Sequence, residues 1–243
     1  MTETVLILGS GPDVVTCRDW DRTPFDHIIA INNAWAVRPD WDSLIYPEDF
    51  PEDRRPAPRR GQRHVTALDY VPAQNSYGGF VYAGGTMAFT AGYWALHHFR
   101  PNVIAYLGCD MVYNRKGGTH FYGTGAADPL RADISLQSLE AKSARLKVMA
   151  AEQGCAMINL SGQKSRLVFP RSTPEDLRRA KAECWSGSAA DAARAAERDL
   201  GYMVLSGRYW EVQDQFDAAA LRRIDDLWMN AASASKEIAE AHA

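Results

Sequence analysis

The sequence predicts an α/β protein: a mostly parallel sheet with flanking helices, followed by a C-terminal helical extension. Six short apolar runs have strand character, and helical stretches lie between the later ones. Strands that alternate with helices indicate a parallel sheet. Because the sequence changes character after Pro170, residues 1–172 are expected to form the sheet domain and residues 173–243 the extension. A chain of 243 residues is long enough for both.

The expected strands are short and rich in aliphatic residues, and each is followed by polar or glycine residues. They are Val5–Leu8, Ile28–Ile31, Ser43–Tyr46, His64–Leu68, Val103–Leu107 and Ala156–Leu160. Helices are expected over Met87–Phe99, which is rich in Ala, Trp and Leu, and over Ser135–Glu152, which has a one-sided apolar pattern.

The extension is expected to be helical, with helix starts at Thr173 and Ser188 and near Asp217. It holds few residues suited to chemistry. Its three tryptophans are interpreted as packing anchors, and its last helix as a candidate contact with a second subunit in a homo-oligomer. These tryptophans are Trp185, Trp210 and Trp228.

Composition argues against several classes of protein. The formal net charge is −3 and the pI is near 6.1, and no long basic run occurs outside one loop, so small polar substrates fit better than nucleic acid. The four cysteines are widely spaced and form no C-x-x-C pair, which favours reduced thiols over a zinc ribbon or disulfide framework. Because no apolar stretch of eighteen residues occurs, we expect no transmembrane segment and a cytoplasmic protein.

A glycine turn, Gly9-Ser10-Gly11-Pro12, follows the first expected strand. Glycine lets bare backbone N–H groups approach an anion, and a proline at this point suits the first position of a helix. The turn therefore predicts a phosphate or nucleotide site. Val14 stands where the dinucleotide fingerprint needs a third glycine or alanine, so NAD is not expected.

Ligands of parallel sheets bind where the strands end, so the residues after each strand are the candidates for binding. Asn32 and Asn33 offer amide groups to a ribose, base or sugar, or else form a turn. Gly84-Gly85-Thr86 precedes a helix and forms either a second N–H cradle or a helix cap. The segment from Asn159 through Ser161 to Ser165 follows the last strand.

The segment after Leu107 is the densest in polar and aromatic residues. It contains Asp110, Tyr113, His120 and Tyr122 within a glycine-rich stretch. His120 is a candidate general base or acid, because imidazole titrates near neutrality, although a lone histidine more often has a structural role. Tyr113 and Tyr122 could donate to a leaving phosphate without a metal, or could simply pack at a strand end.

Few carboxylates lie where they could bind a metal ion. Glu48-Asp49, after the third strand, could serve a magnesium–nucleotide site. The two D-x-D matches, Asp19-Trp20-Asp21 and Asp40-Trp41-Asp42, are interpreted as solvated acids. The arginine-rich segment 52–63 is interpreted as an exposed loop, with a lid over an anionic substrate as the alternative.

The order of these motifs resembles that of the bacterial CMP-sialic-acid-dependent sialyltransferases and the related motility-accessory-factor and pterin pyrophosphokinase-like group. The shared motifs are Leu8-Gly9-Ser10-Gly11-Pro12, Asn32-Asn33, Gly84-Gly85-Thr86, Leu107-Gly108-Cys109-Asp110 and His120-Phe121-Tyr122-Gly123. The segments around Ser161 and Ser165 resemble the last core strand of the group and its loop. The resemblance covers roughly residues 4–170.

The resemblance implies a Rossmann-like fold that binds a nucleotide-activated donor, with glycosyl transfer that needs no metal. Under it, Gly9 to Pro12, Asn32 or Asn33, and Gly85-Thr86 hold the donor, and Tyr113 contacts its phosphate. The sequence also departs from the pattern of the group. Thr124 stands where the basic histidine of the group is found, Ser10 replaces an asparagine, and an asparagine after the third strand is missing around Pro47.

The leading hypothesis is a glycosyltransferase-like enzyme with a CMP-sugar-like donor, a hydroxyl acceptor and no cofactor. His120 is its base, and Tyr113 and Tyr122 stabilise the leaving phosphate. The alternatives are a magnesium-dependent pyrophosphokinase or other phosphoryl transferase, and a nucleotide-binding module without catalysis. The donor-binding candidates are Gly9, Ser10, Gly11, Pro12, Asn32, Asn33, Gly84, Gly85, Thr86, Asp110, Ser161 and Ser165.

Overall fold

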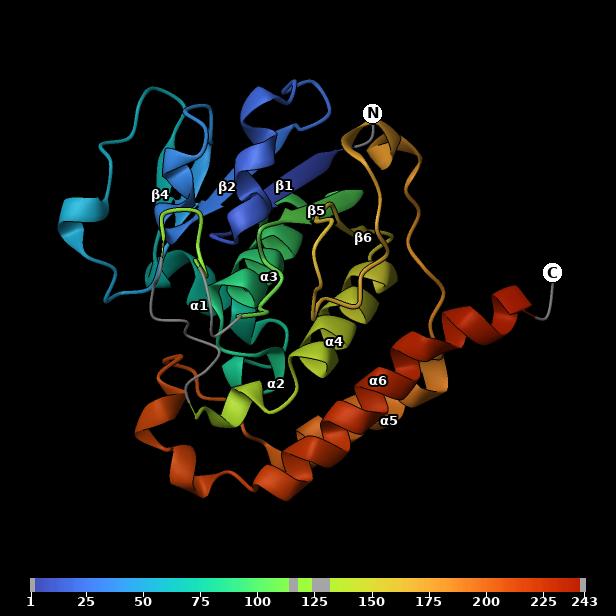
Figure 1. Ribbon diagram of the computed structural model, residues 1–243. Helices are drawn as coiled ribbons and strands as arrows, with labels where there is room; N and C mark the ends of the chain where they lie inside the picture. The colour runs from blue at the N-terminus through green and yellow to red at the C-terminus, as the bar shows by residue number, and fades with distance from the viewer. Residues whose placement is uncertain (1–2, 114–117, 124–131, 241–243) are drawn as a thin grey trace.

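A six-stranded, entirely parallel sheet forms the centre of the molecule (Figure 1). The computed structural model describes residues 3–113, 118–123 and 132–240. The strands are β1 Thr4–Leu8, β2 His27–Ile31, β3 Ser43–Ile45, β4 Arg63–Val65, β5 Val103–Leu107 and β6 Ala156–Asn159. The predicted α/β class and parallel sheet are thus confirmed, and the fold is Rossmann-like.

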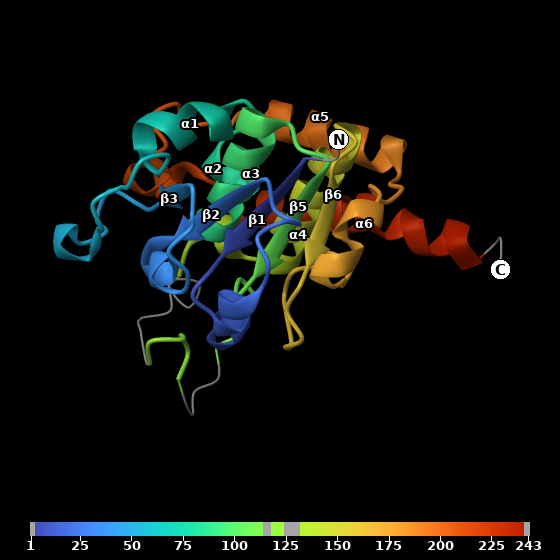
Figure 2. The same ribbon diagram turned by 90° about the horizontal axis from the view of Figure 1, so that it is seen from above.

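The strand order places a topological switch point beside β1. Across the sheet the order is β4-β3-β2-β1-β5-β6, and Figure 2 shows β3, β2, β1, β5 and β6 side by side in this order. The chain leaves β1 toward β2 on one side and later returns to β5 on the other. Open parallel sheets bind ligands in the crevice that such a reversal leaves at the carboxyl ends of the strands.

One face of the sheet is covered by α-helices. Val5 and Ile7 of β1 share a buried core with Phe89, Tyr93 and Trp94 of the central helix. The helices of this layer are α1 Ala67–Asn75, α2 Phe80–Ala83, α3 Met87–Phe99 and α4 Leu139–Glu152. Alternate residues of a strand point to opposite faces, so this core takes every second strand residue.

The opposite face is covered by 3₁₀ turns in place of α-helices. Leu6 and Leu8 of β1 pack there with Val14, Cys17 and Leu177. The turns of this layer are η1 Pro12–Asp19, η2 Asn32–Ala36 and η6 Pro174–Arg179. Because both faces are covered, all five residues of β1 are buried, as a central parallel strand requires.

The C-terminal helices α5 Gly187–Leu200 and α6 Ala218–Glu240 add an outer layer beside α4 (Figure 1). Leu221, Ile224 and Trp228 lie three or four residues apart on α6 and are buried, as their spacing predicts. They belong to the same core cluster as the α3 and α4 residues. These three residues are therefore covered within the chain, and a contact of α6 with a second subunit stays a prediction.

A buried ionic cluster joins these helices. The Arg145 guanidinium of α4 pairs with Glu197 of α5 (Nε–Oε1 2.8 Å), and its Nη1 donates to the Tyr93 hydroxyl (2.8 Å). The indole N–H of Trp228 on α6 donates to the same Glu197 carboxylate (2.7 Å). Each polar group of this cluster thus has a partner, which offsets part of the cost of burying charge.

Several predicted boundaries were wrong, because local capping decided where helices begin. The run His64–Leu68 is not one strand: β4 ends at Val65, and Thr66 and Asp69 form a capping box that starts α1. The predicted helix from Ser135 begins only at Leu139, with Ser138 as its N-cap.

Two predicted helix starts in the extension also shift. The segment after Thr173 forms the 3₁₀ turn η6 and no α-helix. Helix α5 starts at Gly187 with Ser186 as its N-cap, so Ser188 already lies inside it.

Two further expectations concern membranes and cysteines. Within the described residues, no helix is long and apolar enough to cross a membrane. Cys17, Cys109 and Cys155 are buried, and Cys184 is exposed.

Candidate functional site

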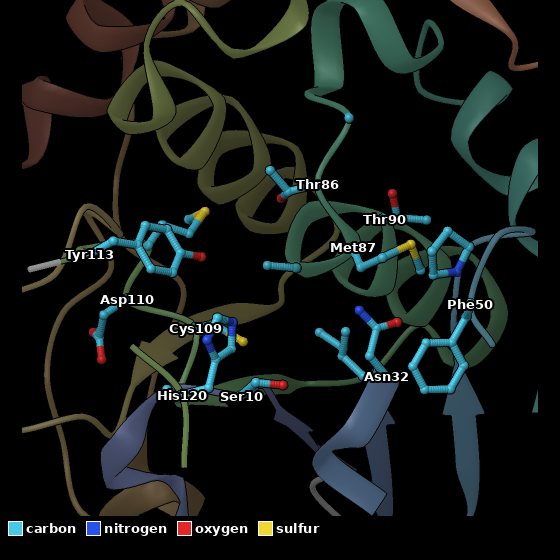
Figure 3. Close-up of a pocket in the computed structure, with 18 of the residues that line it drawn as sticks. Ser10, Asn32, Phe50, Thr86, Met87, Thr90, Cys109, Asp110, Tyr113 and His120 are labelled. Atoms are coloured by element: carbon cyan, nitrogen blue, oxygen red, sulfur yellow. The ribbon is translucent and has the colours of Figure 1, made fainter. Parts of the chain in front are cut away.

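A large cavity opens at the carboxyl ends of β1, β2, β3 and β5, at the switch point of the sheet. Its volume is about 1420 Å³. Gly9–Pro12, Asn32, Pro47–Phe50 and Gly108–Tyr113 line it from the strand ends, and Thr86 to Ala88 line it from the start of α3. In Figure 3, side chains from these separate elements surround one open space.

The glycine turn lies in the cavity wall, but its glycines have a different role from the predicted one. The Gly9 N–H donates to Leu107 O (2.8 Å), and the Gly11 N–H donates to Gly108 O (2.7 Å), so neither is bare. A Cβ at Gly9 would lie 2.3 Å from Gly108 O. The glycines therefore let two strand-end loops touch, and the expectation that their N–H groups face an anion was wrong.

Asn32 is the most distinctive side chain at the strand ends. It opens η2 directly after β2 with a left-handed φ of 51°, a conformation that asparagine tolerates better than most residues. Its amide projects into the cavity in Figure 3. Among the described residues the buried Oδ1 has no hydrogen-bond partner. A buried acceptor without a donor costs free energy, which a ligand donor would recover.

The second glycine motif forms a helix cap, with one edge in the cavity. Thr86 Oγ1 accepts from the Phe89 N–H (3.3 Å), and the Gly85 N–H donates to Ser135 Oγ (3.0 Å). Gly84 packs against Lys142 and Phe89 outside the cavity lining. Thr86 remains at the cavity wall, where the N-terminal end of α3 adds a positive potential.

A tight turn holds His120 against the glycine turn. The His120 N–H donates to Gly123 O (2.9 Å), and the Gly123 N–H donates back to His120 O (3.0 Å). The Phe121 N–H donates to Ser10 O (3.0 Å), which fixes the turn at the end of β1. The sequence-predicted His120 is thereby placed beside Ser10 in the cavity (Figure 3).

The imidazole of His120 lies between two tyrosine rings. Its centroid is 5.0 Å from that of Tyr122 and 6.1 Å from that of Tyr113, and all three residues line the cavity. His120 Nδ1 is 2.8 Å from Thr119 Oγ1. If Nδ1–H donates to Thr119, Nε2 is the basic nitrogen. Partial burial lowers the pKa of His120 below its ordinary value of 6.5, which keeps the neutral base form populated.

The Ser161 hydroxyl contacts two carboxyl groups, those of Asp13 and Asp110. Its Oγ is 2.5 Å from Asp13 Oδ2 and 2.6 Å from Asp110 Oδ2. One hydroxyl has only one hydrogen to donate, so the second contact needs a hydrogen from a carboxyl group. Burial raises the pKa of Asp13, and the neighbouring Asp110 adds to this. Both effects favour the protonated form of Asp13.

This arrangement predicts how stability depends on pH. Since folding raises the pKa of Asp13, its contribution is fully present below the ordinary value of 3.8 and is lost as pH rises through the folded value. The Asp13→Asn variant keeps the group neutral. We therefore expect wild-type melting temperature to fall relative to that of the variant as pH rises from 3.8 toward neutrality.

Thermal melting over a pH series measures this difference. Asp19→Asn, at the exposed far end of η1, is the matched control and should run parallel to wild type. If the melting temperature of Asp13→Asn also runs parallel to that of wild type, Asp13 is charged over the whole pH range.

Comparisons of the chain with family models, curated proteins and solved structures found no match.

Other predicted residues lie away from the cavity lining. Asn33 follows Asn32 in η2 but does not line the cavity, and Ser161 is buried behind it. Ser165 Oγ accepts from the Leu167 N–H (3.2 Å) and stabilises its own loop. Thr124, at the position of the histidine in the resembling group, lies outside the described residues.

The candidate metal ligands divide into two sets. Glu48 and Asp49 line the cavity, as their place after β3 predicts. Asp40 and Asp42 pair with Arg38 and Arg22 and have structural roles. Within the described residues, no group of three or more His, Cys, Asp or Glu side chains could hold a metal ion.

One wall of the cavity was not predicted from the sequence. Arg208, Tyr209, Trp210 and Gln213 line it, although they belong to the extension that was expected to contribute little chemistry. Trp210 is exposed in this wall and is not the buried packing anchor that was predicted. These residues lie far along the chain from the strand ends, so no local pattern connects them with the site.

Proposed function

We propose that this chain is a transferase that binds a nucleotide-activated sugar in the cavity and transfers the glycosyl group to a hydroxyl acceptor. The observation that carries this proposal is the cavity itself. At about 1420 Å³ it exceeds the roughly 300–1,000 Å³ typical of a site for one small ligand. It also contains both strand-end polar groups and a candidate base, as a reaction between two substrates requires.

The strand-end half of the cavity suits a nucleotide. Asn32 offers an unsatisfied amide oxygen to a ribose hydroxyl or a base amino group. The Ser10 hydroxyl and the first turn of α3, at Met87 and Ala88, line the same region and can face a phosphate.

The residues around His120 suit the transfer step. Nε2 of His120 would remove the proton from the acceptor hydroxyl as its oxygen attacks the sugar carbon, and the bond from that carbon to the phosphate oxygen would break. The leaving phosphate carries the developing negative charge. The phenolic groups of Tyr113 and Tyr122, both in the cavity wall, would donate to it.

A second candidate function, magnesium-dependent phosphoryl transfer, is favoured by Glu48 and Asp49. Both carboxylates line the cavity, and Mg²⁺ is commonly held by one or two carboxylates together with substrate phosphates. In this case the metal would neutralise charge on the phosphates.

Thermal melting of the purified protein with CMP, CDP, UDP, GDP, ATP and CMP-sialic acid, each with and without magnesium, tests both candidates. A ligand that binds only the native state raises the melting temperature. A shift with a nucleotide or sugar nucleotide that is insensitive to EDTA supports the glycosyltransferase. A shift with ATP only when magnesium is present supports phosphoryl transfer, and no shift with any of them contradicts both.

The Asn32→Gly variant tests the donor site. Glycine accepts the left-handed φ of 51° without strain, so the variant removes the amide without forcing the backbone to move. We expect unchanged or slightly higher stability. Nucleotide binding should weaken about tenfold, because one lost hydrogen bond costs about 1.4 kcal/mol of binding free energy. Titration calorimetry with the stabilising nucleotide measures it. Asn33→Ala, one residue outside the cavity lining, should bind like wild type.

A further inference from the structure

We infer that the segment of residues 206–213, between α5 and α6, forms a carbohydrate subsite in which the sugar ring of the acceptor stacks on Trp210. This inference rests on the proposed function and adds the chemical class of the acceptor. The residues of the subsite are Ser206, Gly207, Arg208, Tyr209, Trp210 and Gln213, all of which line the cavity.

The segment is held firmly against the sheet domain. The Asn75 amide donates to Leu205 O (2.8 Å), and Gly207 packs so closely on α1 that a Cβ there would lie 3.0 Å from Val71. The buried Tyr209 donates its hydroxyl to Asp133 Oδ2 (2.7 Å). The C-terminal segment is thus a fixed part of the cavity wall, and its side chains have defined positions.

The exposed ring of Trp210 packs against a buried aromatic residue. All seven tryptophans lie in the described residues, and Trp210 alone is exposed, at 53%. Its ring packs edge-on against Tyr209 (centroids 5.6 Å apart), which in turn stacks on Phe80 (6.2 Å). Exposing a large apolar ring costs free energy, so a ligand that covers the indole gains by doing so.

Charged and amide groups line the same cavity as this ring. Arg208 pairs with Glu48 from the loop after β3 (Nη2–Oε2 3.4 Å), and both line the cavity, as does Gln213. A pyranose has one face of C–H groups and a rim of hydroxyl groups. A cavity that offers an indole face together with guanidinium, carboxylate and amide groups therefore matches a sugar better than a purely hydrocarbon ligand, which would make no hydrogen bonds with these polar groups.

The position of residues 206–213 favours binding of the acceptor there over binding of the donor. The groups suited to the nucleotide, Ser10 and Asn32, belong to the strand ends, whereas Trp210 belongs to the separate wall that the C-terminal segment adds. Two substrates that react must bind in one cavity at different places. The strand ends are therefore assigned to the donor and the Trp210 wall to the acceptor.

Binding of simple saccharides tests this assignment with the full chain. The probes are lactose, maltose, N,N′-diacetylchitobiose and N-acetyllactosamine, followed by saturation-transfer NMR and by tryptophan fluorescence. We expect at least one of them to bind. Trp210→Ala should weaken its binding about tenfold, Trp210→Phe should retain most of it, and nucleotide affinity should stay unchanged.

Leu205→Ala is the matched control, because Leu205 is an exposed apolar residue of the same connection (71%) that does not line the cavity. It should bind sugar like wild type. The inference is overturned if no saccharide binds, or if Trp210→Ala weakens nucleotide binding and leaves saccharide binding intact, because Trp210 would then hold the donor base. Failure of every nucleotide to bind would instead overturn the proposed function, whatever the saccharide result.

Discussion

Replacing Arg145 with alanine is expected to lower the free energy of unfolding by about 3–5 kcal/mol, the usual cost of breaking a buried ion pair. The Arg145 side chain is 1% exposed, and its removal leaves the Glu197 carboxylate buried without its main partner. It also removes the donor to Tyr93 and the cation above the Trp228 ring (5.3 Å). This one side chain thus contacts residues of α3, α5 and α6 from its place on α4.

Urea denaturation followed by circular dichroism measures the loss. Arg166→Ala is the matched control, since Arg166 pairs with Glu140 in a bidentate arrangement (2.8 and 2.9 Å) at a site where both side chains are about two-fifths exposed. Such an exposed pair contributes only about 0–1 kcal/mol. Equal, small losses for the two variants would mean that water reaches Arg145, contrary to its burial.

Much of the fold could be predicted because runs of apolar residues indicate which strands and helices are buried. Every expected strand overlaps a strand of the sheet, and helix α3 has the bounds that its sequence predicts. The errors occur where a short polar motif decides the structure. Val65 to Leu68 looks like a continuing strand, but the capping box of Thr66 and Asp69 starts a helix and leaves Leu68 exposed (89%).

The site could be predicted only as far as strand ends locate it. Parallel strands bring their carboxyl ends together, so Ser10, Asn32 and His120 were expected near one another and line one cavity. The bonding of the glycine turn could not be foreseen, because the partners of Gly9 and Gly11 are carbonyls of residues 107 and 108. The Trp210 wall depends on tertiary contacts of the same kind, such as that of Asn75 with Leu205.

The His120→Ala variant is expected to lower kcat about 10²–10⁴-fold, which is the usual contribution of a positioned general base. The reason is that Nε2 would be lost from the cavity wall, while the strand-end groups that suit the nucleotide would stay in place. Nucleotide affinity should therefore be unchanged. Turnover is followed as release of nucleotide from the donor that stabilises the protein, with a saccharide acceptor present.

The pH profile separates loss of a base from loss of structure. Burial lowers the pKa of His120 in the ligand-free protein, so the acid limb of wild-type kcat/KM should have its midpoint below 6.5, with activity rising as pH increases through it. His120→Ala should retain its residual activity without this limb. His97→Ala, at an exposed histidine on α3 outside the cavity lining, should keep both kcat and the limb. If His120→Ala keeps wild-type kcat, another group is the base. Asp110 would be the next to test, because it lines the same cavity.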